Sequence, residues 1–153
     1  GLTSLSASID GGEYFDVYFG PVGSFNFNTD FLLDGTEDGS HIVQLQATDA
    51  AGNVLDALLS LTLDTSAPPA PVFDLAPEYD SAPVGDDQTA FETVTLRGGT
   101  EANAVVVLNP LGFETIADAA GDFEFIDIPL SLGLNEFIVQ ATDPAGNESS
   151  FNK

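Results

Sequence analysis

The stretch Val43-Gln-Leu-Gln-Ala-Thr-Asp-Ala-Ala-Gly-Asn53 decides the fold, because the chain contains it twice. It returns 94 positions later as Phe137-Ile-Val-Gln-Ala-Thr-Asp-Pro-Ala-Gly-Asn147. Upstream, Gly23-Ser-Phe-Asn-Phe27 returns 98 positions later as Gly121-Asp-Phe-Glu-Phe125. Two blocks that recur in the same order indicate an internal repeat, which is the signature of tandem units of one architecture.

Within each copy, apolar and polar residues alternate with a period of two, as in residues 43–47, 59–63 and 105–107. Gly, Asn, Asp and Pro interrupt the alternation at short intervals, and no segment keeps a helical period over several turns. This pattern is typical of antiparallel strands in a sandwich. The sequence therefore predicts an all-β protein.

The two copies contain different sets of expected strands. In the second copy these are residues 70–75, 92–97, 104–108, 113–117, 122–128, 134–142 and 147–152. In the first copy they are residues 3–9, 14–19, 24–27, 40–48 and 54–64. Extending the offset of 98 backwards pairs Ala7-Ser-Ile9 with Val105-Val-Val107, so the first copy begins at the third strand of the repeat. An incomplete sandwich exposes an apolar face and an unpaired edge, so its first two strands were either removed or are supplied by another subunit.

The segment Asp64-Thr-Ser-Ala-Pro-Pro-Ala-Pro71 connects the two copies. Its clustered prolines favour an extended, semi-rigid connection over a flexible one. We place the domain boundary near residue 66, which gives a partial sandwich over residues 1–66 and a second sandwich over residues 67–153 with a short last strand. Because the chain has neither an initiator Met nor a leader segment, we expect it to be a piece of a longer protein.

Several of these motifs resemble bacterial immunoglobulin-like repeat domains. They are Ala-Thr-Asp-Ala-Ala-Gly-Asn at 47–53, its Pro variant at 141–147, Leu63-Asp-Thr-Ser-Ala-Pro68, Thr93-Val-Thr-Leu-Arg-Gly-Gly-Thr-Glu-Ala-Asn-Ala104 and the Gly-x-Phe-x-Phe strands. The resemblance covers nearly the whole chain. It implies two tandem immunoglobulin-like sandwiches in an extracellular rod whose joints Ca²⁺ often rigidifies, as part of a very large exported adhesin, biofilm or cell-surface protein. The chain departs from the pattern in the missing first two strands and in the acidic segment 74–87.

Charge narrows the range of partners. The 153 residues include 25 Asp and Glu but only Arg97 and Lys153 as cations, for a formal charge of −23. Nucleic acids and anionic membranes are thus excluded as expected partners, and without an 18-residue apolar run no membrane insertion is expected. The absence of Cys excludes disulfides and thiolate metal sites. An acidic chain without counter-charges repels itself, so divalent cations are the first partners to expect.

Four polar residues are predicted to converge where the chain enters the second sandwich. In a seven-strand immunoglobulin-like sandwich, the loops between strands two and three and between strands six and seven lie at that end. These loops hold Glu101 in one case and Asp143 and Asn147 in the other, and the preceding strand delivers Asp64 to the same place. Because Ca²⁺ prefers several oxygen ligands, we predict a structural Ca²⁺ at this joint. The alternative is that Asp143 and Asn147 only form the hairpin turn, where Asx and Gly are favoured anyway.

Two further sets of residues are candidate calcium ligands. The first copy repeats the pair as Asp49 and Asn53 but lacks the loop between strands two and three, so a metal there needs ligands from elsewhere. Asp80, Asp86 and Asp87 could fold around a cation, although they lack the spacing of an EF-hand loop. The alternative for this second set is a solvated charged loop.

No catalytic motif stands out. His41 is the one imidazole, and at the start of an expected strand a solvated surface position is the commonest outcome. The chain has no Gly-x-Ser-x-Gly elbow and no phosphate-binding loop before a helix. Carboxylates are so numerous that any chosen pair is uninformative about glycoside hydrolysis. We therefore predict no enzyme activity.

Aromatic residues suggest one alternative function. Strand alternation places Phe15, Val17 and Phe19 on one face, and Tyr14 and Tyr18 with acidic neighbours on the other. A face of Tyr and acid could bind glycans, although exposed Tyr on a strand more often covers the sheet or packs on a neighbour.

The sequence as a whole predicts a non-enzymatic structural repeat, a stalk segment of a large bacterial surface or adhesin-like protein, stiffened by Ca²⁺. Its expected partners are neighbouring repeats of the same protein or identical subunits. The alternatives are the subunit of an extracellular fibre or filament, assembled by β-strand complementation, and the glycan-binding module.

Overall fold

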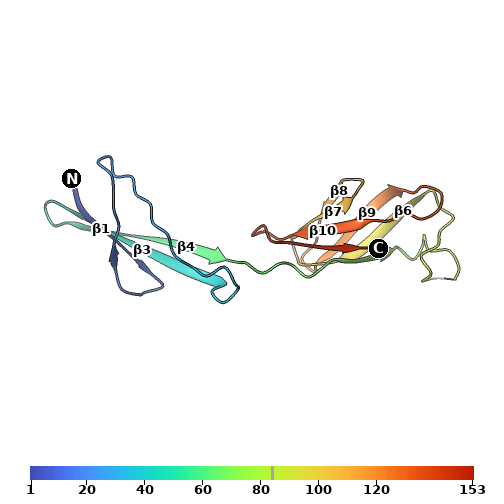
Figure 1. Cartoon of the computed structure of the whole chain (residues 1–153), viewed down its shortest axis with the longest axis horizontal. Coiled ribbons are helices and arrows are strands. Elements are labelled where there is room, and N and C mark those ends of the chain that lie inside the picture. Colours follow the sequence, from blue (N-terminus) through green and yellow to red (C-terminus); the bar gives the residue numbers. More distant parts are fainter. Residues whose placement is uncertain (84) are drawn as a thin grey trace. The chain divides into compact units, whose positions relative to one another are not determined.

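The computed structural model describes residues 1–83 and 85–153 and divides the chain into two compact units, Gly1–Thr65 and Ser66–Lys153, here called unit 1 and unit 2. Every regular element of the described residues is a β-strand, and the strands form three antiparallel sheets (Figure 1). This confirms the all-β prediction and is consistent with a sandwich architecture. The described residues contain no helix long and apolar enough to cross a membrane.

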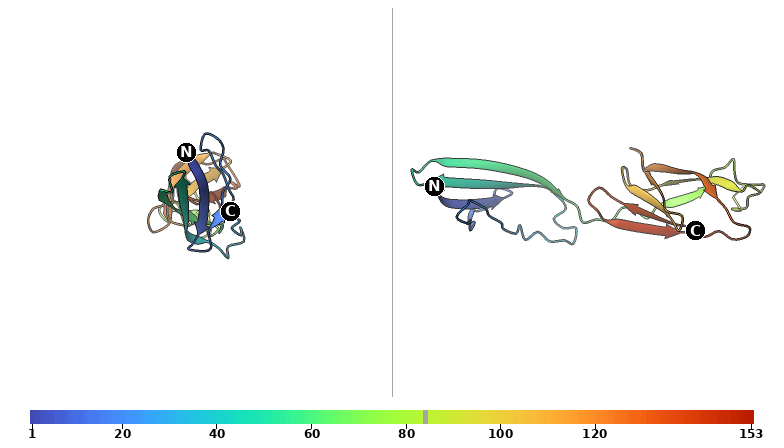
Figure 2. Two further views of the ribbon diagram at one scale, coloured as in Figure 1. Left: turned by 90° about the vertical axis from the view of Figure 1, so that its left-hand side faces the viewer. Right: turned by 90° about the horizontal axis from the view of Figure 1, so that it is seen from above.

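Unit 1 contains one sheet of four strands. They are β1 (Leu2–Ile9), β2 (Phe15–Asp16), β3 (Gly39–Asp49) and β4 (Val54–Leu63), in the order β2-β1-β3-β4. β3 and β4 form a long hairpin, which is prominent in the right-hand view of Figure 2. β4 is an edge strand of this sheet.

Unit 2 contains two sheets. Its strands are β5 (Val72–Leu75), β6 (Thr93–Gly99), β7 (Val105–Asn109), β8 (Phe113–Ile116), β9 (Asp122–Pro129), β10 (Ile138–Thr142) and β11 (Glu148–Asn152). One sheet has the order β11-β10-β7-β8, and the other has the order β5-β6-β9.

The four-stranded sheets of the two units have the same topology. In both, a central strand (β3 or β10) pairs with the hairpin partner that follows it (β4 or β11) and with an earlier strand (β1 or β7). That earlier strand pairs in turn with a short edge strand (β2 or β8). The internal repeat seen in the sequence is therefore a repeat of one sheet.

The pairing register corrects one part of the sequence alignment. Ala47 lies opposite Leu5, and its repeat equivalent Ala141 lies opposite Val106. Leu5 therefore corresponds to Val106, and the expected pairing of Ala7 through Ile9 with Val105 through Val107 is wrong by three positions. The reason is that paired residues of β1 and β2 lie three positions further apart in the sequence than those of β7 and β8, since Ser6 pairs with Asp16 whereas its equivalent Val107 pairs with Glu114.

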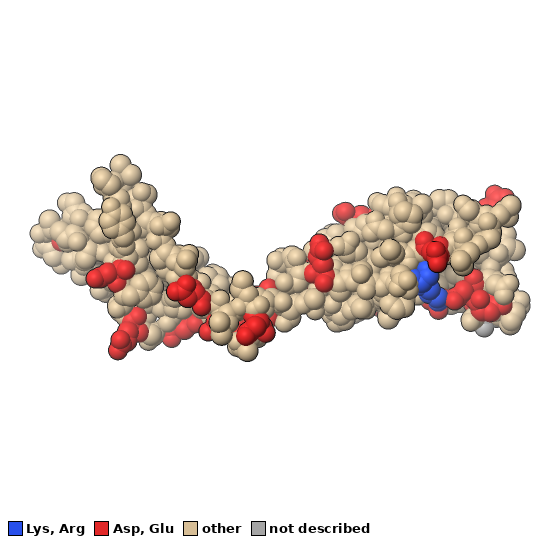
Figure 3. All heavy atoms as spheres, viewed as in Figure 1, with Lys and Arg blue, Asp and Glu red and all other residues tan. Residues whose placement is uncertain are grey.

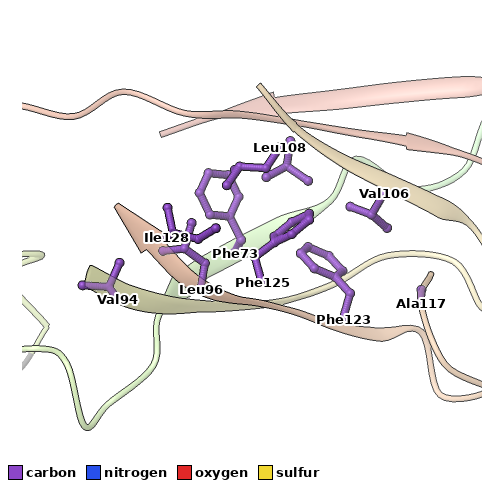
Figure 4. Packing of buried hydrophobic residues seen from close by; sticks show 10 residues of the cluster. Phe73, Val94, Leu96, Val106, Leu108, Ala117, Phe123, Phe125 and Ile128 are labelled. Carbon is purple, nitrogen blue, oxygen red and sulfur yellow. The ribbon is translucent and has the colours of Figure 1, made fainter. Parts of the chain in front are cut away.

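The core of unit 2 lies between its two sheets (Figure 4). Alternation along each strand sends every second side chain inward, which is why β7 contributes Val106 and Leu108 and β9 contributes Phe123 and Phe125. The remaining buried members of the cluster are Phe73, Val94, Leu96, Ala117, Ile128 and Val139.

Gly98 on β6 is required for this packing. A Cβ atom there would lie 2.4 Å from the Phe123 ring and 2.4 Å from the carbonyl oxygen of Val72. The ring of Phe123 therefore occupies the space that a side chain at position 98 would need.

Unit 1 buries a much smaller cluster. Leu5, Ala7 and Val17 form it, and Phe19 and Phe27 from the segment between β2 and β3 pack against it. This segment covers part of the apolar face of the sheet but forms no second sheet.

Two strands expected in unit 1 are absent or shorter. Residues 24–27 correspond to the start of β9, which in unit 2 pairs with β6. Unit 1 contains no strand equivalent to β6, so residues 24–27 make only an isolated bridge between Phe25 and Phe19. The expected strand at 14–19 shortens to β2.

In unit 2, the expected strand 134–142 begins only at Ile138. Asn135 closes a turn before it, because its side-chain oxygen accepts the N–H of Ser131 at 2.8 Å and its amide donates to the carbonyl of Ser131 at 2.9 Å. Side-chain bonds of this kind hold the backbone in a turn and delay the strand.

We predict that Leu108→Ala lowers the free energy of unfolding of unit 2 by ~2–5 kcal/mol, because Leu108 is fully buried and its loss leaves a cavity. Leu134→Ala is the matched control, since Leu134 is 85% exposed, and it should change stability by less than about 0.5 kcal/mol. Urea denaturation followed by circular dichroism measures both, and equal effects of the two substitutions would contradict this assignment of the core.

Candidate functional site

The loop from Asp143 to Asn147 is a closed five-residue structure. The backbone N–H of Asp143 donates to the carbonyl of Asn147 at 3.0 Å, and the N–H of Gly146 donates to the carbonyl of Asp143 at 3.1 Å. The Oδ1 atom of Asp143 accepts three backbone N–H groups, from Ala145 at 2.8 Å, Gly146 at 2.7 Å and Asn147 at 2.9 Å. Its Oδ2 atom accepts the side-chain amide of Asn147 at 2.8 Å. The Asp143 carboxylate thus accepts the N–H donors that the turn leaves unpaired, and the residue is only 5% exposed.

The loop from Asp49 to Asn53 repeats this arrangement in unit 1. Oδ1 of Asp49 accepts the N–H groups of Ala51 at 2.8 Å and Asn53 at 2.9 Å, and Oδ2 accepts the side-chain amide of Asn53 at 2.8 Å. The backbone bonds are also the same, from Asp49 N–H to the Asn53 carbonyl and from Gly52 N–H to the Asp49 carbonyl. Each loop joins the central strand of its sheet to the following edge strand.

A third loop of this type connects β8 to β9 and was not predicted. Oδ1 of Asp118 accepts the N–H groups of Ala120 at 2.8 Å and Asp122 at 3.0 Å. The sequence signal was present, because Asp-Ala-Ala-Gly-Asp at 118–122 differs from Asp-Ala-Ala-Gly-Asn at 49–53 only in its last residue. Gly121 has a φ of 87°, as the fourth position of the loop requires.

A fourth loop has the same backbone without the carboxylate. Residues 20–24 in unit 1 correspond to the loop 118–122. There the N–H of Gly20 donates to the carbonyl of Ser24 at 2.8 Å, and the N–H of Gly23 donates to the carbonyl of Gly20 at 2.9 Å. Gly20 replaces the Asp that begins the other loops. The carboxylate therefore reinforces a loop that the backbone alone can also form.

These hydrogen bonds stabilise the charged form of the loop carboxylates. Burial raises the pKa of Asp143, but the hydrogen bonds from the Asn147 side chain and from the loop backbone outweigh it and hold the pKa below its ordinary value. The pKa of Asp49 is lowered first by the side-chain hydrogen bond from Asn53 and then by the backbone bonds from Asn53 and Ala51. Both carboxylates are thus best stabilised as anions.

The loop carboxylates fit a turn-closing role better than calcium coordination within one unit. Ca²⁺ takes 6–8 oxygen ligands, whereas the N–H donors of the loop already occupy Oδ1 of Asp143. Across residues 1–83 and 85–153, no group of three or more Asp, Glu, His or Cys side chains is arranged to hold a metal ion. The alternative turn assignment for Asp143 and Asn147 therefore has direct support in their hydrogen bonds.

The other two predicted ligands, Asp64 and Glu101, belong to different units. Asp64 follows the end of β4 in unit 1 and is half-buried. Glu101 lies half-buried in the turn between β6 and β7, where its carbonyl accepts the N–H of Ala104 at 3.3 Å.

Asp80, Asp86 and Asp87 each interact with a different partner. Asp80 Oδ2 accepts the N–H of Gly85, and both oxygens of Asp86 accept donors of Gln88. Asp87 pairs with Lys153 at 2.9 Å. Asp80 Oδ1 is the one buried side-chain polar atom without a hydrogen-bond partner in the described part of the chain. The three carboxylates are therefore not gathered around a common centre.

His41 is packed against Phe31 and largely shielded from solvent, so the expectation of a solvated surface histidine is wrong. Its side chain is 12% exposed, because the segment between β2 and β3 folds back and places the Phe31 ring 4.1 Å from the imidazole. Nδ1 lies 2.7 Å from Asp10 Oδ2, and Nε2 lies 2.7 Å from the carbonyl oxygen of Glu37. The hydrogen bond to Asp10 raises the pKa of His41, and the Glu37 carbonyl adds to the increase. With an acceptor at both nitrogens, this imidazole has no free nitrogen to act as a base.

Both cationic side chains lie in unit 2 and are paired. Arg97 contacts Glu124 at 2.8 Å and Glu78 at 3.0 Å, and Lys153 contacts Asp74 at 2.8 Å as well as Asp87. Figure 3 shows the cationic atoms of one face set among carboxylates, with carboxylates spread over both units. Neither cation contributes a free positive patch to the described surface.

The tyrosines of the alternative glycan surface are partly exposed. Tyr14 is 45% exposed and Tyr18 is 86% exposed, while Val17 between them is buried. Phe15 packs edge-on against Phe27, with ring centroids 5.6 Å apart. Of the expected apolar face, Val17 is buried, whereas Phe15, at 39% exposed, is nearly as accessible as Tyr14.

Comparison with known proteins gives a likeness to solved structures but no family match. No protein-family model and no curated protein matches the chain. Among solved structures, it is similar to a tetra-tandem repeat in the extending region of a large adhesion protein, with 20% sequence identity and a TM-score of 0.41. The match covers 97% of this chain, which spans 39% of the length of that chain.

We predict that Asp143→Asn flattens the acid side of the pH–stability profile. The folded-state pKa of Asp143 is depressed, so its contribution is present above the unfolded pKa of about 3.9 and is lost as the pH falls through the folded-state value. The variant should be less stable than the wild type at pH 7 and should lose less stability between pH 5 and pH 2.

Thermal unfolding from pH 7 down to pH 2 measures this difference. Glu136→Gln is the control, because Glu136 is exposed in the same unit. If Asp143→Asn lost as much stability as the wild type between pH 5 and pH 2, this would contradict a role of the ionised carboxylate in closing the loop.

Proposed function

We propose that this chain is a non-enzymatic structural repeat, a stalk segment of a large cell-surface or extracellular adhesion protein. The observation that supports it most directly is the repetition of one sheet, with the same five-residue loop after its central strand, in both units. Tandem copies of one architecture are how proteins build length, because each copy contacts mainly its neighbours. The resemblance of the loop motifs to bacterial immunoglobulin-like repeats points to the same class.

The roles of the polar side chains support a structural function. The two Asp-Asn pairs are used to close turns, and His41 is bonded at both ring nitrogens. These side chains therefore lack the free donor or acceptor that acid–base catalysis requires. Arg97 and Lys153 are likewise occupied by carboxylates.

Charge supports the proposed location and a role for Ca²⁺. A formal charge of −23 destabilises a compact chain by self-repulsion, and an exterior rich in divalent cations relieves it. We include Ca²⁺ in the proposal as the ion that neutralises carboxylates and limits bending along the chain. Asp64 and Glu101 are the foremost candidate ligands among the residues predicted from the sequence, and Asp143 could add only Oδ2, because its Oδ1 accepts three backbone N–H groups.

The test is to remove Ca²⁺ from the intact chain. We expect a chelator to lower the melting temperature and to broaden the distribution of dimensions seen by small-angle X-ray scattering. Ca²⁺ should restore both, with a Kd on the order of 10⁻⁴–10⁻³ M, as in extracellular modules. Calorimetry should show smaller binding heats for Asp143→Ala than for the wild type.

The control separates binding from screening. NaCl at the same ionic strength screens surface charge but offers no divalent ion, so it should restore less stability than Ca²⁺ does. Equal recovery in NaCl, with identical calorimetric heats for the wild type and Asp143→Ala, would contradict a calcium-stiffened stalk.

A further inference from the structure

The same sheet is covered in unit 2 and partly open in unit 1. Val139 and Ala141 on β10 are completely buried, whereas their equivalents on β3, Leu45 and Ala47, are only half-buried. The difference has a local cause. The sheet β5-β6-β9 covers the first pair, and unit 1 contains no equivalent of β5 and β6.

The aromatic residues that face this sheet show the same contrast. Phe123 on β9 is 5% exposed, and its unit 1 equivalent Phe25 is 45% exposed. In unit 2 the backbone of Gly98 on β6 lies against the Phe123 ring. In unit 1 nothing equivalent to β6 lies beside Phe25, which makes only the bridge to Phe19.

The contacts of the edge strand β11 in unit 2 identify the segment that unit 1 lacks, which is the equivalent of β5. Ser149 and Phe151 on β11, and Lys153 just after it, contact the segment that leads into and forms β5. Ser149 Oγ donates to the carbonyl of Pro69 at 3.2 Å, the Phe151 ring lies 6.1 Å from the Phe73 ring, and Lys153 Nζ contacts Asp74 at 2.8 Å.

The corresponding positions of β4 in unit 1 are apolar and exposed. The register of the hairpin puts Leu55, Ala57 and Leu59 on the face that carries Leu45 and Ala47. Leu55 is 71% exposed and Leu59 is 58% exposed. A long edge strand with an uncovered apolar face is a surface that pairs with further strands.

We propose that the open side of unit 1 binds a two-stranded β-ribbon of the β5–β6 type, supplied by the polypeptide directly ahead of the unit. One strand pairs with residues 24–27 as β6 pairs with β9. The other lays its apolar side chains on Leu55, Ala57 and Leu59. This inference rests on the tandem-repeat part of the proposed function and is independent of Ca²⁺.

The geometry of unit 2 favours a ribbon from the same chain over one from a second copy. β6 reaches β7 through a connection of only five residues, 100–104, so a ribbon in the same polypeptide is held beside its site at high effective concentration. A second copy would have to detach its own β6 from β9, where six residue pairs join the strands, and expose Phe123 and Phe125.

The experiment adds the ribbon to the full chain. Ser4 corresponds to Val105, and the bulge between Leu2 and Ser4 adds one residue, so Gly1 corresponds to Asn103 and a second copy of residues 67–102 is fused directly ahead of Gly1. We expect slower hydrogen exchange at residues 24–27 and in β4, loss of the binding of the hydrophobic dye ANS, and a monomer by light scattering.

Leu55 and Leu58 provide a matched pair of variants. Both lie on β4 with nearly equal exposure, 71% and 70%, but the register places them on opposite faces. Leu55→Asp should abolish the protection that the fused ribbon gives, and Leu58→Asp should leave it intact. Neither substitution should unfold the wild-type chain, because both side chains are exposed there.

Two results would overturn the inference. If the wild-type chain alone forms dimers at micromolar concentration in which β4 is protected, a second copy covers the face. If the fused ribbon leaves exchange and dye binding unchanged, or if Leu55→Asp and Leu58→Asp act alike, no ribbon binds this face. Neither result bears on the calcium experiment, so failure here is distinguishable from failure of the calcium-stiffened stalk.

Discussion

The structure depends on the need to cover one apolar face of a twisted sheet. In unit 2, the strands β10 and β7 bury Val139 and Leu108 completely because the sheet β5-β6-β9 lies over them. This burial is the main source of stability in a sandwich, since apolar area removed from water contributes about 25 cal/mol per Å². The same sheet in unit 1 has only the segment between β2 and β3 for cover, and its buried cluster is correspondingly small.

The acidic residues have a double role in this fold. Asp49, Asp118 and Asp143 begin loops in which a carboxylate oxygen accepts backbone N–H groups that a tight turn leaves unpaired. Each of these carboxylates stabilises its own loop, although the formal net charge of −23 makes the chain as a whole repel itself. The charge imbalance is therefore partly a consequence of how the turns are made.

The repeated motif and the period-two alternation were sufficient to predict the all-β fold and most strands. They could not predict that residues 24–27 fail to form a strand, because strand formation there depends on a partner that is absent from unit 1. They also missed the register of β1, since an offset carried across a connection of different length no longer applies.

The candidate site was less accessible from sequence than the fold. Spacing identified the pairs Asp49–Asn53 and Asp143–Asn147, but oxygen ligands and turn-closing oxygens are the same residue types, so only the hydrogen bonds distinguish the two roles. His41 was misjudged because its burial comes from Phe31 and Asp10, which are distant in sequence from the strand that carries it.

Hydrogen exchange of individual amides in the wild-type chain tests the central claim most directly. β3 and β10 are central strands of identical topology, each paired on both sides, so hydrogen bonding alone would protect them equally. If the apolar cover of the sheet governs stability, the amides of residues 44–47 will exchange faster than those of residues 138–141. Equal protection of the two strands would contradict the claim that unit 1 is a sheet still lacking its cover.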